Sequence, residues 1–244
     1  MRQARLQRLA AAQELYVENL LAEGAVYVLS SDGKEIGYGI TDRTDWLLEI
    51  HIADASLPHA EQALEVLVRR LGIRHMLAQS FDPLAMFLGL ARRAPAITSG
   101  LLYRVIVDPG FEPRRDIIAC LGRSEDVDAL AALSDDFFHD RQHINAYLAV
   151  DGLMVYRNAR GTLIGAGVMK AAIPELQDVD IGMVVGPAHR RRGYGVYIIR
   201  HLKAHCLSRG WRPVCGCAIE NIASQRTLER AGFASMHKLV EFRI

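Results

Sequence analysis

The residues best suited to chemistry in this chain of 244 residues lie together at positions 189–195, which read His-Arg-Arg-Arg-Gly-Tyr-Gly. An apolar run at residues 179–185 precedes them and predicts a buried strand, and apolar residues at helical spacing follow over residues 196–207. A strand, a glycine-spaced turn and a helix in this order bring free backbone N–H groups and the positive end of a helix to one point. The three arginines add charge there, so the stretch predicts an anion site that suits a pyrophosphate.

Two motifs carry a resemblance to a known family. The spacing Arg190-x-x-Gly193-x-Gly195 resembles the acyl-CoA-binding signature of the GNAT superfamily of N-acetyltransferases, and residues 220–233 are similar to the later motif of that family. The order and separation of the two motifs agree with the family over about the last third of the chain. The turn lacks the third glycine of a dinucleotide-binding fingerprint, which argues against that alternative.

The resemblance implies a GNAT-type acyltransferase that uses acetyl-CoA as co-substrate and needs no metal. Backbone N–H groups of the turn would bind the pyrophosphate, and the strand before it would pair with the pantetheine arm. A backbone N–H of Val184 or Val185 would stabilise the oxyanion. The cofactor-binding residues implied in this way are Met183, Val184, Val185, Arg190, Arg191, Arg192, Gly193, Tyr194, Gly195, Val196, Asn221 and Ser224.

The expected reaction is transfer of the acetyl group directly to a primary amine of a small molecule or peptide. An alkylamine has a pKa of about 10.4, so a base must take a proton before the amine attacks the thioester. Asp178 and Asp180 are the first candidates for this base, because strand alternation puts both on one face. His139, Glu175 and His237 are further candidates.

The acid that would protonate the leaving thiolate stays open. Many GNAT enzymes place a tyrosine seven residues after the motif asparagine, and this chain has Leu228 there. Tyr194, Tyr197 or Ser224 could serve as a catalytic acid, or the thiolate could leave unassisted, since a thiol has a pKa of about 8.5. The alternative function is a catalytically weak or inactive acyl-CoA-binding regulatory module. Transfer to a hydroxyl, or of another acyl group, is a third candidate.

The order of the expected elements repeats along the chain, and a shift of 128 residues pairs Gly24 with Gly152 and Gly33 with Gly161. We therefore expect an α/β fold (an α+β sandwich) with two GNAT-like mixed β-sheet units and flanking helices in tandem. A degenerate GNAT-like domain is expected at residues 1–112 and a GNAT acetyltransferase domain at residues 113–244. The first copy has residues 53–59, without arginine or glycine, in place of the basic turn, so a structural role is expected for it.

Composition narrows the class of partner. Half of the residues are hydrophobic and 23% are charged, which predicts a packed core. The net charge of +1 argues against a nucleic-acid partner. No apolar stretch has membrane-spanning length and no apolar leader follows Met1, so we expect no membrane partner and a cytoplasmic location. The four cysteines, Cys120, Cys206, Cys215 and Cys217, are expected to be reduced thiols.

Three local patterns make further predictions. Residues 4–21 predict one amphipathic helix and residues 125–137 another. Asn221 is expected to cap a helix over residues 223–231. Residues 236–244 alternate and predict a final strand, whose edge could pair with a second copy of the chain, so a homodimer is the candidate assembly.

Overall fold

The computed structural model describes residues 1–133 and 137–244, and its contacts divide the chain into two compact units. Unit 1 consists of Met1–Leu102, Gly216–Glu220 and Ser235–Ile244, and unit 2 consists of Tyr103–Cys215 and Asn221–Ala234. The units are thus interleaved along the chain, whereas the sequence pattern predicts the consecutive segments 1–112 and 113–244. The C-terminal strand contributes to this difference, because it pairs within unit 1.

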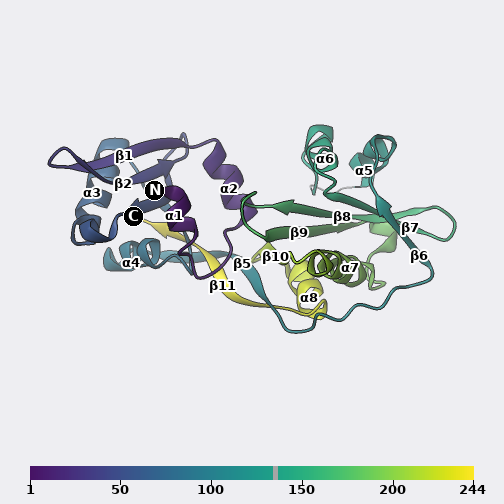
Figure 1. Ribbon diagram of the computed structural model, residues 1–244. Helices are drawn as coiled ribbons and strands as arrows, with labels where there is room; N and C mark the ends of the chain where they lie inside the picture. The colour runs from purple at the N-terminus through teal and green to yellow at the C-terminus, as the bar shows by residue number, and fades with distance from the viewer. Residues whose placement is uncertain (134–136) are drawn as a thin grey trace. The chain divides into compact units, whose positions relative to one another are not determined.

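Unit 1 contains a mixed sheet with the strand order β1-β2-β3-β4-β11-β5. The hairpin of β1 and β2 is followed by antiparallel pairing of β2 with β3, parallel pairing of β3 with β4, and antiparallel pairing of β4 with β11. The elements, labelled in Figure 1, are α1 (Arg2–Leu6), α2 (Leu15–Ala22), β1 (Ala25–Ser31), β2 (Lys34–Thr41), β3 (Trp46–Ile52), α3 (Ala60–Leu71), β4 (His75–Gln79), α4 (Pro83–Ala91), β5 (Ala96–Ile106) and β11 (Phe233–Arg243). β5, β11 and also β10 (Arg212–Ala218) have residues in both units.

Helix α3 forms because its apolar residues repeat at helical spacing. Ala60, Ala63, Leu64 and Leu67 are buried and join one core cluster with strand residues such as Ile50. The helix ends at Gly72, which has a φ of +67° and so takes the left-handed conformation of a C-terminal cap at low cost.

The single helix predicted at residues 4–21 is wrong, since α1 and α2 are separated by a non-helical segment. The break lets this segment satisfy buried polar groups of the sheet. The N–H of Glu14 donates to Oε1 of Gln79 at 2.9 Å, and Nε2 of Gln79 donates to Oε1 of Gln13 at 2.5 Å. Buried polar groups need such partners, and these partners lie far away in sequence, so periodicity alone does not reveal the break.

The strands of unit 2 have the order β10-β9-β8-β7-β6. The pairing is antiparallel from β6 to β9 and parallel between β9 and β10. The elements are β6 (Ile117–Leu121), α5 (Val127–Leu133), α6 (Arg141–Leu148), β7 (Leu153–Asn158), β8 (Leu163–Ala171), β9 (Asp178–Val185), α7 (Tyr194–Ser208), β10 (Arg212–Ala218) and α8 (Ile222–Arg230). Mixed sheets with flanking helices in each unit confirm the predicted fold class.

The two faces of the unit 2 sheet are covered by different helices. Figure 1 shows α5 and α6 on one face of β8 and β9, and α7 on the opposite face. Leu130 of α5 and Ile144 of α6 pack in one core cluster with Val184 of β9. Alternate residues of β9 therefore face α5 and α6, and the others face α7.

Two further local predictions need correction. The helix predicted at residues 125–137 is a short 3-10 helix, Ser124–Asp126, followed by α5, and residues 134–136 lie outside the described part of the chain. The final strand is present as β11, but it lies between β4 and β5 and pairs with β4 from Leu239 to Arg243. Its edges are used within the chain, so it does not offer a free edge to a second copy.

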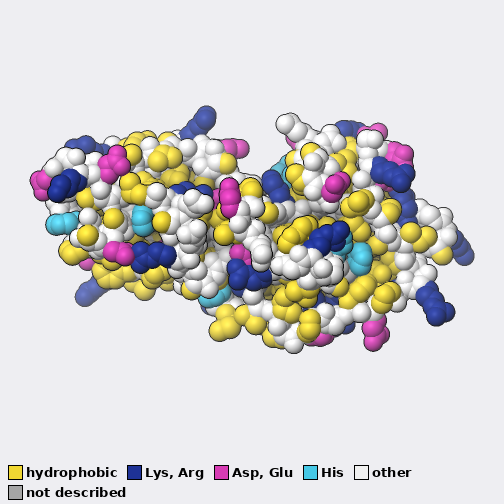
Figure 2. All heavy atoms as spheres, viewed as in Figure 1, with side chains coloured by type: hydrophobic (Ala, Val, Ile, Leu, Met, Phe, Trp, Pro, Cys, Tyr) yellow, Lys and Arg dark blue, Asp and Glu magenta, His cyan; other side chains and the backbone are white. Residues whose placement is uncertain are grey.

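Charges of both signs are mixed on the surface that Figure 2 shows, with apolar side chains between them. The basic side chains on that face are separated by acidic and apolar ones and do not form one continuous band. Among the described residues, no helix is both long enough and apolar enough to cross a membrane.

Candidate functional site

The site in unit 2 begins where two parallel strands separate. In the described residues, β9 pairs with β10 at three positions only, from Asp178 with Arg212 to Asp180 with Val214. On its other side β9 stays paired with β8 from Val179 to Val185. Beyond Asp180, one edge of β9 is therefore open, and its backbone groups can pair with another extended molecule.

Strand alternation decides which backbone groups face the open edge. The N–H of Gly186 donates to the carbonyl of Ile164 in β8 at 2.9 Å. The carbonyl of Val184 also faces β8, since it lies 2.2 Å from the place of a Cβ added to Gly165. The intervening residue Val185 must point the other way. Of the two donors that the resemblance implies for the oxyanion, the N–H of Val185 thus faces the open edge and that of Val184 does not.

The basic turn follows directly and has unusual backbone angles. Arg191 has a φ of +59° and Gly193 a φ of +78°, so the chain passes twice through the left-handed region before α7 begins at Tyr194. A non-glycine residue at such a φ costs energy, and such costs gather at ligand-binding turns. Nε of Arg190 donates to the carbonyl of Val185 at 3.1 Å, which ties the turn to the end of β9.

Gly193 and Gly195 have different structural roles in the turn. A Cβ added to Gly193 would meet no protein atom within 4 Å, so open space lies above it. A Cβ added to Gly195 would lie 3.2 Å from Thr227 of α8 and 3.4 Å from Met183 of β9. Gly193 leaves room beside the start of α7, where free N–H groups favour an anion, and Gly195 allows close packing of α7 on its neighbours.

Asn221 caps α8 as predicted. Its Oδ1 accepts a hydrogen bond from the N–H of Ser224 at 3.0 Å. Ser224 lies in the first turn of this helix and is half-buried, and Leu228 is 4% exposed. A buried leucine occupies the position at which a catalytic tyrosine was considered, so that position supplies no proton.

Asp178 is a buried carboxylate that forms an ion pair with the largely exposed Arg212. Its side chain is 6% exposed, and both of its oxygens accept from Arg212, one of them from Nη2 at 2.7 Å. The hydrogen bonds that Arg212 donates to Asp178 raise the pKa of Arg212, against the effect of burial. Because this pair sits at the closed end of β9 and β10, it stabilises the strand pairing, and Asp178 is a poor candidate for the base. The sequence offered no signal for the pair, since its members are 34 residues apart.

Asp180 lies where the strands separate and has ionisable neighbours. It is half-buried and stands directly opposite Lys170 of β8 in the strand register. Burial and the nearby carboxylate of Asp180 raise the pKa of Tyr147 to about 12. Tyr147 belongs to α6, so Asp180 points to the face covered by α5 and α6, as does Gly182, whose added Cβ would lie 3.4 Å from Phe137. Tyr147 is a site neighbour that residue spacing does not reveal.

The other candidate acids and bases are spread over both units. Tyr194 contacts Arg114, whose guanidinium carbon lies 5.0 Å from the ring centre, and Tyr197 stacks on His201 at 6.3 Å between ring centres. His139 is exposed and stacks on His143 of α6. The remaining two, Glu175 and His237, are an exposed loop residue of unit 2 and a residue of unit 1 that packs edge-on against Phe81.

His189 is a residue that the motif includes but that the prediction left without a role. Its Nδ1 is buried and has no hydrogen-bond partner among the described residues. Its ring lies edge-on to Tyr194 in the same turn. A buried polar atom without a partner is uncommon in folded proteins, so this nitrogen is an unexplained polar atom of the turn.

Comparison with known families agrees with this architecture. The family model described as "Acetyltransferase (GNAT) domain" matches residues 1–104, and the model described as "Acetyltransferase (GNAT) family" matches residues 134–233. The chain therefore belongs to the GNAT superfamily of acetyltransferases and carries two GNAT domains in tandem. Acyl transfer is the activity that this membership supports.

Individual relatives are more distant. "Uncharacterized N-acetyltransferase YjdG" of Bacillus subtilis (strain 168) is 37% identical over 67 residues, which cover 27% of this chain and 40% of that relative. An acetyltransferase of the GNAT family from Colwellia psychrerythraea has a similar structure, with a TM-score of 0.88 and 15% identity, covering 100% of this chain and 94% of that one. A tandem GNAT protein from the clavulanic acid biosynthesis pathway has a TM-score of 0.64 and 16% identity, covering 96% and 88%. The two solved structures support the fold alone.

Proposed function

We propose that unit 2 transfers the acetyl group of acetyl-CoA directly to a primary amine of a small molecule or peptide. The observation that carries this proposal is the open edge of β9 next to a basic turn with two left-handed residues. An extended amide-bearing arm that ends in a pyrophosphate needs both features, a strand edge to pair with and an anion site at its end.

The residues of the turn would bind acetyl-CoA through its phosphates. Backbone N–H groups from Arg191 to Val196 would donate to the pyrophosphate, with Arg190, Arg191 and Arg192 adding charge. The pantetheine amides would pair with the open edge of β9 at Met183 and Val185. The N–H of Val185 is then the donor we assign to the oxyanion of the tetrahedral intermediate.

Asp180 is the base we assign to the reaction. The protonated amine gives its proton to the carboxylate of Asp180, directly or through a water molecule, and the free amine nitrogen attacks the thioester carbon. A C–N bond forms, the C–S bond breaks, and coenzyme A leaves as a thiolate. Tyr194, Tyr197 or Ser224 would return a proton to it, or it would leave unassisted, because a thiolate is a tolerable leaving group at a thiol pKa of about 8.5.

A second candidate function is an acyl-CoA-binding regulatory module without efficient catalysis. The buried Leu228, in place of a tyrosine acid, favours it. Turnover distinguishes the two functions. A binding module would take up acetyl-CoA and release no coenzyme A with any amine.

The test is titration calorimetry with acetyl-CoA, followed by release of coenzyme A with a panel of primary amines. We expect one acetyl-CoA per chain, and turnover with at least one amine. Binding without turnover would favour the regulatory module, and turnover with hydroxyl acceptors alone would replace the amine as the acceptor. An absence of binding would contradict the assignment of the turn.

The proposal also includes the acceptor and the cellular compartment. The acceptor is a small-molecule or peptide amine, with neither a nucleic acid nor a membrane as partner. We place the protein in the cytoplasm, because a reducing compartment keeps thiols such as that of Cys120 reduced.

A further inference from the structure

Unit 1 contains a cavity of about 430 Å³ at the end of its own parallel strand pair. In the described residues, β3 pairs with β4 only at Trp46 with His75 and Leu47 with Met76, so the two strands separate beyond these positions. The cavity lies beside the last residues of β3, including Ile50 and Ile52. Its size is within the range of about 300–1,000 Å³ that is usual for small-molecule sites.

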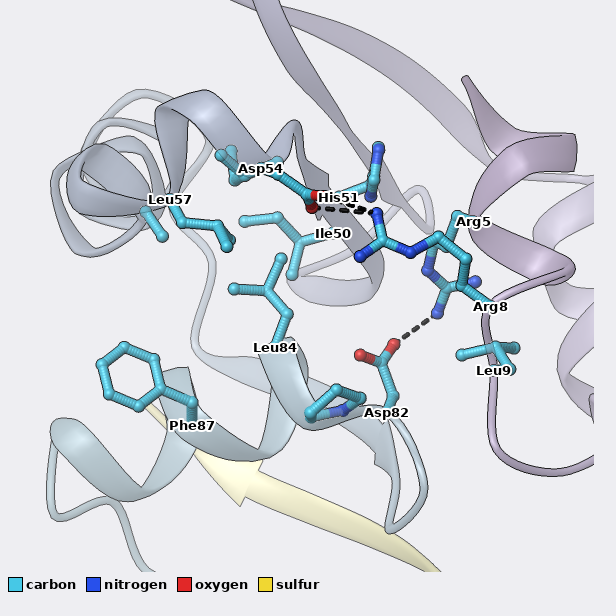
Figure 3. A pocket seen from close by; sticks show the side chains of 13 residues that line it. Arg5, Arg8, Leu9, Ile50, His51, Asp54, Leu57, Asp82, Leu84 and Phe87 are labelled. Carbon is cyan, nitrogen blue, oxygen red and sulfur yellow. Dashed lines mark hydrogen bonds and ion pairs between the residues drawn. The ribbon is translucent and has the colours of Figure 1, made fainter.

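The walls of this cavity are mainly apolar. Ile50 and Ile52 are each 1% exposed, whereas Leu57 and Phe87 at the rim are 44% and 53% exposed. Figure 3 shows Leu57, Ile50, Leu84 and Phe87 around one space, with Phe87 and Leu84 coming from α4. When an apolar molecule covers large apolar side chains that are partly exposed to water, the free energy of the complex falls, so these rim side chains favour binding of such a molecule.

The charged groups at the bottom of the cavity already have partners. Arg5 pairs with Glu49 at 2.8 Å and with Asp82, and the side chain of Asp82 also accepts from the N–H of Ala85. The side chains of Arg5 and Asp82 are each 8% exposed. Glu49 also accepts from Nε of Arg2 at 3.1 Å, so each of these charged groups is paired within the unit.

Arg8, at the rim, has donors to spare. Its Nη1 donates to both oxygens of Asp54 at 2.9 Å, and no described residue accepts from its Nε or Nη2. In Figure 3 the Arg8 guanidinium lies next to the Asp54 carboxylate, at the side of the apolar space. Nε and Nη2 form a planar pair of donors, which matches the two oxygens of a carboxylate.

The neighbouring turn does not suit a phosphorylated ligand. The 3-10 helix Asp54–His59 carries a carboxylate at its start, and none of its described residues has a positive φ. The features that make an anion site of residues 189–195 in unit 2 are therefore missing here. Burial and the charge of Arg5 lower the pKa of His51, so its ring adds no full positive charge at neutral pH.

We propose that the cavity of unit 1 binds a small monocarboxylate with an alkyl or aryl body. The carboxylate accepts from Nε and Nη2 of Arg8, and the apolar body lies against Ile50, Ile52, Leu84 and Phe87. This site is separate from the proposed transferase site of unit 2, and its test does not depend on acetyl-CoA binding or turnover.

The test is titration calorimetry of the full chain with butanoate, hexanoate and octanoate. Each methylene buried against the cavity wall should strengthen binding by roughly threefold to fourfold. Octanamide and octylamine, which have the same alkyl chain and a different head, should bind at least about tenfold more weakly than octanoate. Equal affinities for octanoate, octanamide and octylamine, tighter binding of octylamine than of octanoate, or no binding of octanoate would each overturn the proposal.

A variant pair assigns the binding to this cavity. Arg8→Met should lower octanoate affinity by about tenfold or more and leave octanamide affinity nearly unchanged. Arg74→Met is the matched control, because Arg74 also forms an exposed ion pair in unit 1, with Asp45 at 2.6 Å, and does not line the cavity. Both variants should keep the unfolding temperature of the parent, and an equal loss of octanoate binding in both, or no loss in Arg8→Met, would refute the assignment.

Discussion

The two units repeat one layout and differ in the chemistry of one turn. In each, two parallel strands separate early, a 3-10 helix follows the strand, and a helix runs back, namely α3 in unit 1 and α7 in unit 2. In each, a short polar side chain caps the next helix, with Asp82 accepting from Ala85 at 3.3 Å and Asn221 from Ser224 at 3.0 Å. The scaffold is the same, so the turn decides which ligand each unit can hold.

The turn of unit 2 is shaped for an anion and that of unit 1 is not. Arg191 and Gly193 have positive φ in unit 2, and open space lies above Gly193. Unit 1 has Asp54, whose carboxylate is held by Arg8, at the matching place in the layout. Charge and backbone freedom at a few positions thus separate a proposed pyrophosphate site from an apolar cavity.

The largest effect is expected for Gly193→Val, which should lower acetyl-CoA affinity by about 100-fold or more. The reason is that valine at a φ of +78° forces the turn to rearrange and moves at least two N–H donors away from the pyrophosphate. Calorimetry measures the affinity, and circular dichroism checks the fold.

Gly161→Val is the matched control. Gly161 lies in the same unit, has a φ of +77°, and has no protein atom near an added Cβ. Both variants should lose about 1–3 kcal/mol of unfolding free energy from the strained backbone, and only Gly193→Val should lose affinity. Normal affinity in a folded Gly193→Val protein would remove the turn from the site.

Asp180→Asn should lower kcat by about 100-fold and leave the affinity for acetyl-CoA unchanged, because an amide cannot take a proton from the amine. The control is Asp178→Asn, which breaks the pair with Arg212 at the closed end of the same strand. It should cost about 1–2 kcal/mol of unfolding free energy, since Arg212 is 64% exposed, and change kcat little. Equal kcat in Asp180→Asn and the parent at every pH would exclude Asp180 as the base.

The smallest expected effect concerns His201 on α7, which makes a 2.8 Å hydrogen bond through Nδ1 with the buried Tyr156 hydroxyl. Burial, and then the charge of His205, lower the pKa of His201. A lowered pKa in the folded state means that the unfolded state binds more protons, so this histidine reduces stability as the pH falls below about 6.5.

His201→Gln should therefore lose roughly 1 kcal/mol of unfolding free energy at pH 8, from the missing hydrogen bond. The difference from the parent should narrow as the pH falls through 6.5, because only the parent then pays for charging His201. Denaturant unfolding at several pH values measures both. A constant difference from pH 8 to pH 5 would show that the histidine does not titrate differently in the folded chain.

The sequence predicted the structural features that depend on residues close together in the chain. The strand before the basic turn, the helix after it and the cap by Asn221 follow from periodicity and from the position of a capping residue, and the structure confirms them. The repeat of elements also predicted two units of one fold. These features are encoded by local spacing, because side chains that share a face lie two, three or four positions apart.

The remaining features depend on residues far apart in sequence. The break between α1 and α2 follows from hydrogen bonds between Glu14 and Gln79, and the place of β11 in unit 1 follows from its pairing with β4. The pair of Asp178 with Arg212, which distinguishes two aspartates that look alike in the sequence, is likewise a long-range contact. Residue types and local spacing specify the strand, the turn and the helix of the basic site, together with the chemistry of that turn. The tertiary fold places Asp178 in an ion pair with Arg212 and Asp180 where the strands separate, and it forms the cavity of unit 1, because burial and ion pairing depend on packing partners that residue spacing does not specify.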